Sequence, residues 1–295
     1  MQRPPRPPAF LRVIAGALAF ALGLGATGVA APAPPPVRVV SQTVGTDELL
    51  VAVAAPGQVA ALSHLARDPV FSVIAAEAGK FPQIASGDAE TILKFSPTLV
   101  LVADYSRAEL VAQVRRAGVR VLVFDHYQTL DDAFANLRLL GRELGPDASA
   151  RAERIIADGQ ARMRVLAEKL RGATPVRVLA PSTYGVVGGA GTTFQDLCDH
   201  AGATNLATTL GHLTGHAAPP NEQMLTWPVD RLVVSGTSVA TALAPFRSLP
   251  PYQFMPAVRE GRAVLIDECL LSCVTHHRIE GYEQLARALH PELFK

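Results

Sequence analysis

Short apolar runs alternate with amphipathic stretches from residue 37 to the end of the chain. Runs such as Leu99–Val102 and Leu232–Val234 are too apolar for a sheet face in water, so they predict buried strands. Strands that alternate with helices predict parallel sheets covered on both faces. The expected strands are Val37–Val40, Val59–Leu62, Thr98–Val102, Val119–Phe124, Val176–Ala180, Arg231–Ser235 and Ala263–Ile266. The expected helices are Asp47–Val53, Val73–Ala78, Asp88–Lys94, Arg107–Ala117, Leu130–Leu144, Thr193–His200 and Ile279–Leu289.

One short pattern occurs twice, on either side of a long helical stretch. Glu90 lies in a short helix that leads through a proline-marked turn into a buried strand, and the residues after Glu222 follow the same order. Between the copies, apolar positions recur near helical spacing until Gly172, which predicts one helix about 37 Å long. The pattern predicts an α/β fold of two doubly wound lobes, each with a mainly parallel sheet, joined by one long α-helix. We assign residues 37–146 to the N-terminal lobe, 147–172 to the connecting helix and 173–295 to the C-terminal lobe.

The first residues differ in kind from the rest. Three arginines precede the apolar segment Val13–Ala30, and small residues follow it, which is the layout of a signal peptide. We expect residues 1–31 to be removed on export to the periplasm and the Pro-rich residues 32–36 to form a linker. An uncleaved membrane anchor is the alternative. No cysteine lies near the cleavage site, so we expect a protein that is not a lipoprotein.

Composition and charge exclude several function classes. The net charge is +1 and aromatic residues make up 6%, so no basic or base-stacking surface for nucleic acid is expected. The chain has no Gly-x-Ser-x-Gly elbow, no His-Glu-x-x-His helix and no phosphate-binding Gly-Lys-Ser/Thr loop, and we predict that it is not an enzyme. The three cysteines are Cys198, Cys269 and Cys273, an odd number that allows at most one disulfide.

At several motifs the chain resembles a known family. These motifs are Arg38-Val-Val-Ser41, Ala89-Glu90-Thr-Ile-Leu-Lys-Phe-Ser-Pro-Thr-Leu-Val100, Ala117-Gly-Val-Arg-Val121 and Phe194-Gln-Asp-Leu-Cys-Asp-His-Ala-Gly-Ala-Thr-Asn205. Together with the export signal and the long helix, they look like the substrate-binding proteins of ABC importers for ferric siderophores, cobalamin and haem, the class III type. The resemblance covers nearly all of the mature chain and is strongest from Val37 to Leu144.

The resemblance implies a partner and a cargo. In such proteins one acidic residue on each lobe pairs with arginines of the membrane permease, and the matching residues here are Glu90 and Glu222. The cargo is a metal chelate held in a shallow cleft between the lobes, so no intrinsic cofactor is expected. Proteins of this kind are monomers by default.

Cleft residues are expected in loops at the carboxyl ends of the strands. Aromatic rings, hydroxyls and imidazoles at such positions suit a planar macrocycle. The candidates are Gln42, Thr43, His64, Tyr105, His126, Tyr127, Tyr184, His276 and Arg278. Tyr105 leads because a phenol can ligate ferric iron or stack on a tetrapyrrole; an ordinary loop tyrosine is the alternative. Arg278 is a candidate anchor for a carboxylate.

The sequence therefore predicts a periplasmic solute-binding protein that captures a ferric siderophore, a corrinoid or haem and delivers it to an ABC importer. The alternative is an exported metal-ion-binding protein or metalloenzyme. It would use His64, His126, His212, His216 and His276 as ligands. Whether a protein side chain ligates a metal is left open.

Overall fold

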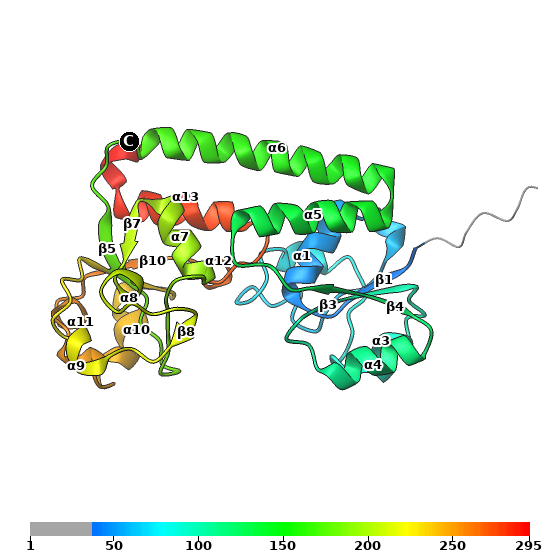
Figure 1. The fold of residues 1–295 in the computed structure, drawn as a ribbon, viewed down its shortest axis with the longest axis horizontal. Coiled ribbons are helices and arrows are strands. Elements are labelled where there is room, and N and C mark those ends of the chain that lie inside the picture. Colours follow the sequence, from blue (N-terminus) through cyan, green and yellow to red (C-terminus); the bar gives the residue numbers. More distant parts are fainter. Residues whose placement is uncertain (1–36) are drawn as a thin grey trace, which may run out of the picture. The chain divides into compact units, whose positions relative to one another are not determined.

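The computed structural model describes residues 37–295, and its first half contains a four-stranded parallel sheet (Figure 1). The strand order is β2-β1-β3-β4, with every neighbouring pair parallel. The strands are β1 (Val39–Ser41), β2 (Val59–Ala61), β3 (Leu99–Ala103) and β4 (Arg120–Phe124). The bounds of β2, β3 and β4 lie within one residue of the predicted bounds, and β1 begins two residues later than predicted. The predicted signal peptide and linker lie outside the described residues.

A second four-stranded parallel sheet, of order β10-β9-β5-β7, forms in the second half. Its strands are β5 (Val176–Leu179), β7 (Ala203–Asn205), β9 (Arg231–Val234) and β10 (Ala263–Leu265). The sequence pattern did not predict β7, because three residues of mixed polarity carry no strand signal. Within the glycine-rich stretch 185–191, β6 (Val187–Gly188) pairs antiparallel with β8 (His216–Ala217) instead of forming only a loop. Two sheets in an α/β arrangement confirm the predicted fold class.

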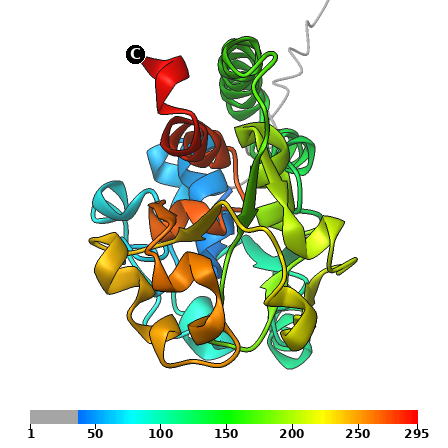
Figure 2. The same cartoon turned by 90° about the vertical axis from the view of Figure 1, so that its left-hand side faces the viewer.

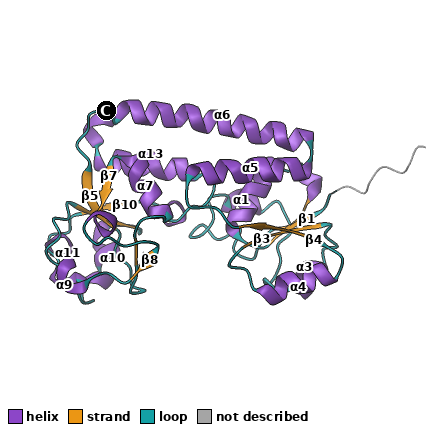
Figure 3. Cartoon of the chain, in the orientation of Figure 1, coloured by secondary structure: helices purple, strands orange, loops and turns teal. Residues whose placement is uncertain are grey.

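Helices cover both faces of each sheet (Figure 3). The first half has α1 (Val44–Val53), α2 (Ala75–Ala78), α3 (Ala89–Leu93), α4 (Ala108–Arg116) and α5 (Leu130–Leu144). The second half has α7 (Thr193–Ala201), α8 (Leu206–Thr209), α9 (Asn221–Met224), α10 (Val239–Leu243), α11 (Pro256–Arg259), α12 (Glu268–Leu271) and α13 (Arg278–Leu289).

Strand β3 shows why the apolar runs do not alternate between apolar and polar residues. Leu99 and Leu101 belong to the core that includes α1 and α5, whereas Val100 and Val102 belong to a separate core that includes residues of α3 and α4. All four side chains are at most 1% exposed. A strand buried on both faces has no polar face, which is why its sequence is continuously apolar.

Helix α6 (Pro146–Lys169) is the predicted long helix, and it contacts both halves. It begins with a proline at its first position and ends near Leu170, so it stops three residues before the predicted residue 172. At 1.5 Å per residue its 24 residues span about 36 Å. Figures 1 and 2 show α6 along one side of the molecule, with α5 and α13 between it and the sheets.

Gly159 marks the place where α6 meets both halves. A Cβ atom at this position would lie 2.9 Å from Phe134 Cζ of α5 and 2.8 Å from Ile279 Cδ1 of α13. Real Cβ contacts are not this short, so the helices approach this closely only because residue 159 has no side chain. Helix α6 therefore supports the helices of both sheets from outside. Within residues 37–295, no helix combines the length and the apolar character needed to cross a membrane.

Candidate functional site

The first sheet carries an open pocket, here called pocket A, at the carboxyl ends of its strands. Along the chain, β1 is followed by β2, which lies on one side of it, and then by β3, which lies on its other side. The strand order therefore reverses at β1. Open parallel sheets bind ligands at such a reversal. Pocket A has a volume of about 340 Å³. Its lining is Gln42, Thr43, Val44, Gly45, Glu48, Ser63, His64, Leu65, Phe71, Tyr105, Cys269, Ser272, Cys273 and Val274.

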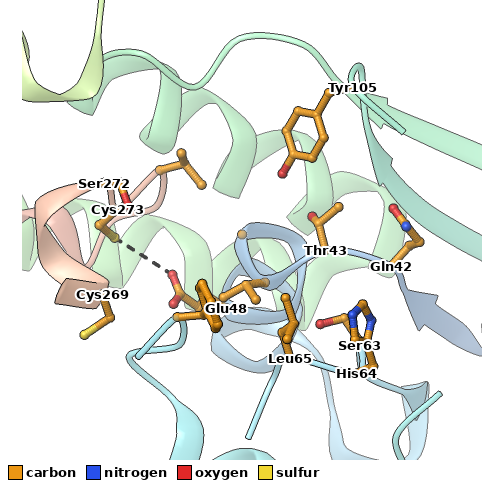
Figure 4. Close-up of a pocket in the computed structure, with 14 residues that line it drawn as sticks. Gln42, Thr43, Glu48, Ser63, His64, Leu65, Tyr105, Cys269, Ser272 and Cys273 are labelled. Carbon is orange, nitrogen blue, oxygen red and sulfur yellow. Dashed lines mark hydrogen bonds between the residues drawn. The ribbon is translucent and has the colours of Figure 1, made fainter. Parts of the chain in front are cut away.

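Four predicted site residues line pocket A: Gln42, Thr43, His64 and Tyr105 (Figure 4). Tyr105 is 66% exposed, and burial of the remainder raises the pKa of its phenol. Its ring meets the ring of Tyr127 edge to face, with centroids 6.1 Å apart. Tyr127 lines a small adjoining hollow with Thr43 and Tyr105. These neutral rings suit stacking on a ligand, because an aromatic face contributes apolar area at little entropic cost.

Gln42 is held in position by hydrogen bonding. Ser106 Oγ donates to Gln42 Oε1 at 2.7 Å, and a Cβ atom on Gly87 would lie 2.8 Å from Gln42 Nε2. The amide nitrogen is the end of Gln42 that can still donate to a ligand. Gln42 therefore supplies an oriented donor at the end of β1.

Two consecutive carboxylates of α1 were not predicted as part of the site. Asp47 and Glu48 are 0% and 3% exposed. Asp47 accepts hydrogen bonds from Ser63 Oγ at 2.5 Å and from Ser63 N at 2.9 Å. Burial outweighs these bonds and raises the pKa of Asp47 to about 7. No sequence signal marks this burial, because a charged pair at the start of an amphipathic helix usually faces water.

Glu48 joins the two halves of the molecule at the wall of pocket A. Thr275 Oγ1 donates to Glu48 Oε2 at 2.6 Å, and Val73 N donates to Glu48 Oε1 at 3.0 Å. The thiol of Cys273 lies 3.9 Å from Glu48 Oε2. Burial raises the pKa of Glu48. The carboxyl is thus held by residues from both halves and borders the space that a ligand would fill.

Replacing Asp47 by asparagine should flatten the dependence of stability on pH. Since the pKa of Asp47 rises on folding from 3.8 to about 7, the native protein binds a proton that the unfolded chain releases. This contribution is fully present below about pH 4 and is lost as the pH rises through about 7. The two pKa values differ by about 3, which corresponds to about 4 kcal/mol. Urea unfolding at pH values from 4 to 8 measures how the free energy of unfolding changes with pH.

The matched control for this experiment is Asp158→Asn, at an exposed position of α6. It should keep the wild-type slope of stability against pH. If Asp47→Asn also kept that slope, the assignment of the buried proton to Asp47 would be wrong.

The second sheet carries a larger pocket, here called pocket B, of about 640 Å³. It lies at the carboxyl ends of β5 and β9, where the order of the second sheet reverses at β5. Tyr184, a predicted site residue, lines it and is 90% exposed. His216 and Glu268 line it as well. Pockets A and B share Ser272, an exposed residue directly after α12, so they adjoin at this residue, and the two pockets together are here called the groove.

Besides Tyr127, three predicted site residues line neither pocket A nor pocket B. His126 is exposed, and its hydrogen bond with Asp125, 2.7 Å from Nδ1 to Oδ1, raises the pKa of the imidazole. His276 is largely enclosed, and burial lowers its pKa to about 3, so the ring stays neutral. Its Nδ1 is buried without a hydrogen-bond partner. Its ring lies against that of His277, with centroids 4.2 Å apart. Neither His276 nor His277 lines the groove.

Arg278, the third, is an internal structural residue in this fold. It is 2% exposed, and Nη1 donates to Asp196 Oδ2 at 2.9 Å. Nη2 donates to the carbonyl oxygens of Cys273 and Tyr127 at 2.8 and 3.0 Å. Both Nη groups are engaged inside the protein, and Arg278 lines neither pocket A nor pocket B. It ties the second half to the first, because Tyr127 follows β4.

The cysteines are free in the described structure, and two of them line pocket A. Burial raises the pKa of Cys273 to about 12 and also raises that of Cys269. Cys198 is fully buried in α7. Among residues 37–295, no group of three or more histidine, cysteine, aspartate or glutamate side chains is arranged to hold a metal ion.

Glu90 and Glu222, the predicted docking residues, are both exposed. Glu90 Oε1 lies 3.0 Å from the ammonium of Lys94, one helical turn further on. Helix α3 carries Glu90 and α9 carries Glu222. Figure 1 shows both helices on the side of the sheets that faces away from α6.

Comparison with known proteins gives a consistent picture. A family model described as periplasmic binding protein matches residues 39–270. The substrate-binding lipoprotein YvrC of Bacillus subtilis, an uncharacterised ABC-transporter protein, is 21% identical over 215 residues. This match covers 70% of the chain and 66% of YvrC, which is less than two thirds of that relative's length.

Solved structures share the fold. The periplasmic haem-binding protein RhuT of Roseiflexus sp. RS-1, in its apo form, has a TM-score of 0.72 at 23% identity, covering 88% of this chain and 99% of RhuT. The periplasmic vitamin B12-binding protein BtuF of Vibrio cholerae has a TM-score of 0.67 at 18% identity, covering 88% and 99% of the two chains.

Proposed function

Because this chain belongs to the periplasmic binding protein family, we propose that it captures a metal chelate and delivers it to an ABC importer. The family is non-enzymatic, which agrees with the prediction from the sequence motifs. The observation that carries the proposal is the groove in which pockets A and B meet at Ser272. Ligand pockets have volumes of about 300 to 1,000 Å³, and both pockets fall in this range.

The lining of the groove supports a bulky, partly aromatic or macrocyclic cargo. Tyr105 lies on the side of pocket A, and Tyr184 lies on the side of pocket B. Both rings are mostly exposed, so a flat ligand can cover them without moving the core. Fold relatives that are described as binding haem or vitamin B12 make a ferric siderophore, a corrinoid or haem the proposed range of cargo.

Titration of the purified protein with a ferric siderophore, cyanocobalamin and haem tests this proposal. Each of these chelates is coloured, so absorption and fluorescence quenching both report binding. We expect saturable binding of at least one chelate at a ratio of one per chain. Absence of saturable binding with every chelate would remove the proposed function.

We also propose that Glu90 and Glu222 dock on basic residues of the permease. Their exposure and the shared side of α3 and α9 support this role (Figure 1). Glu90 would exchange Lys94 for a permease arginine, a small cost because exposed ion pairs contribute only about 0 to 1 kcal/mol. Two such contacts would mainly set orientation and encounter rate.

Reversing both charges, Glu90→Arg with Glu222→Arg, should lower chelate uptake by cells about tenfold, since each contact changes from attraction to repulsion. The dissociation constant of the purified protein for its chelate should not change, because neither residue lines the groove. Glu153→Arg with Glu168→Arg reverses the same number of exposed charges on α6 and should leave uptake intact. Equal uptake by both double variants would contradict the docking role.

The family is extracytoplasmic, and we propose the periplasm as the location, reached through a cleaved signal peptide at residues 1–31. YvrC is a lipoprotein. The cysteines of this chain are residues 198, 269 and 273, so we propose that it is released without a lipid anchor. Of the histidines in the metal-ion alternative, His64 lines pocket A and His216 lines pocket B, whereas His126, His212 and His276 lie outside both linings.

A further inference from the structure

The described lining of the groove contains no permanently charged cationic side chain. Among residues 37–295, no lysine or arginine lines pocket A or pocket B. The ionisable acids of the linings include Glu48 in pocket A and Glu268 in pocket B. A ligand with negative groups would therefore meet carboxyls and neither lysine nor arginine. Like-charge contacts disfavour binding strongly, so the charges of a groove select its ligand.

From this lining we infer that the cargo is a neutral or cationic metal chelate and that the groove discriminates against anionic chelates. The inference rests on the proposed function and narrows its cargo. The inference predicts weaker binding of chelates with carboxylate side groups, such as haem with its propionates, than of chelates that carry a free ammonium group or no charge.

Glu268 and Glu48 would affect a charged ligand in different ways. Glu268 is exposed at the start of α12, so its carboxyl group is in contact with water. Glu48 is buried, and burial favours its neutral form. A cation that enters pocket A would favour the charged form of Glu48, because an opposite charge nearby lowers the pKa of a carboxyl. Neither form of Glu48 carries a positive charge.

The helix ends at the groove do not replace the missing cations. The first residues of α1 line pocket A, and Thr193 at the start of α7 lines pocket B. A helix N-terminus has a partial positive charge of about half a unit. Each of these helices carries a carboxyl in its own first turn, Asp47 in α1 and Asp196 in α7. At pH 8, above its pKa of about 7, Asp47 counters the positive end of α1, and Asp196 lies at the start of α7 in an ion pair with Arg278.

Three further arginines lie outside both linings. Arg278 is buried and donates to Asp196 and to two backbone carbonyls. Arg67 donates to the carbonyl oxygen of Phe81 at 2.7 Å, and it lines neither pocket. Arg107, only two residues from Tyr105, does not line pocket A.

A series of ferric trihydroxamates that differ only in charge tests the inference. The three probes share one neutral iron chelate and end in a free ammonium, an N-acetyl or an N-succinyl group, which makes them cationic, neutral and anionic. The titrations are carried out at pH 8, where free imidazole is neutral. At low salt the cationic probe should bind about tenfold more tightly than the anionic probe, with the neutral probe between them. The ratio should shrink at high salt.

Haem and cyanocobalamin extend the panel. Tightest binding by any anionic member, haem included, would overturn the inference and leave the proposed function in place. Failure of every member to bind would overturn the proposed function itself.

Variants at Glu268 and Glu48 test which side chains cause the preference for a cationic probe. Glu268→Gln should reduce the ratio between the cationic and the anionic probe at least threefold, and Glu48→Gln should act in the same direction. Since Glu48 is buried and its replacement could affect folding, the exposed Glu268 provides the independent test. Glu109→Gln, at an exposed position of α4 outside both linings, should leave the ratio unchanged. An unchanged ratio in both groove variants would contradict the inference.

Discussion

Replacing Arg278 by alanine should destabilise the protein by about 3–5 kcal/mol, the loss expected when one partner of a buried ion pair is removed. Asp196 would keep its carboxylate, buried in α7, without the guanidinium that now lies 2.9 Å away. Tyr282 donates its hydroxyl to the same carboxylate and cannot supply the missing charge. The carbonyl oxygens of Tyr127 and Cys273 would also lose a donor. Urea unfolding at constant pH measures the loss.

Arg138→Ala is the matched control for this experiment. Arg138 also holds a carboxylate with two hydrogen bonds, to Glu153 at 2.8 and 3.1 Å, but both side chains are largely exposed. Exposed pairs contribute about 0 to 1 kcal/mol, so this variant should be nearly as stable as the wild type. Equal destabilisation by the two substitutions would contradict the structural role of Arg278.

Replacing Ser272 by tryptophan should weaken chelate binding by roughly tenfold to a hundredfold. Ser272 is the residue that pockets A and B share, so an indole there would occupy the passage between them. Extra volume in a fitted space costs about 1–3 kcal/mol, and each 1.4 kcal/mol corresponds to about a tenfold change in the dissociation constant. Fluorescence or absorption titration with the chelate that the wild type binds measures this change.

Because Ser272 is exposed, the substitution should leave the free energy of unfolding nearly unchanged. Ser248→Trp places the same indole at another exposed serine, outside both linings, and should retain wild-type affinity. Wild-type affinity in a well-folded Ser272→Trp protein would show that the ligand does not cross between the pockets.

Much of the fold was predictable, because its signals are local. Continuous apolar runs such as Leu99–Val102 predict strands that are buried on both faces, and the structure has such a strand in β3. The spacing of apolar residues in α6 predicts a helix with one buried stripe, formed by Ala148, Ala152, Ile156, Gly159 and Leu166. Strand β7 was missed, because Ala203–Asn205 becomes a strand only by pairing with β5.

The candidate site was predictable only in part, for a different physical reason. Gln42, Thr43, His64 and Tyr105 follow strands, so the rule for parallel sheets places them at the edge that pocket A occupies. The burial of Glu48 and of Arg278 depends on partners more than 80 residues away in the chain, Thr275 and Asp196 respectively. No local pattern encodes such pairs. The sequence therefore suggested Arg278 as a ligand contact, whereas in the fold it binds groups inside the protein.

The central claim is that one groove, formed by pockets A and B, holds a metal chelate. A crystal structure of the protein with the chelate that it binds most tightly tests this claim most directly. We predict a single chelate that lies over Ser272 and contacts Tyr105 on one side and Tyr184 on the other. A chelate bound elsewhere, with Ser272 still open to solvent, would contradict the account.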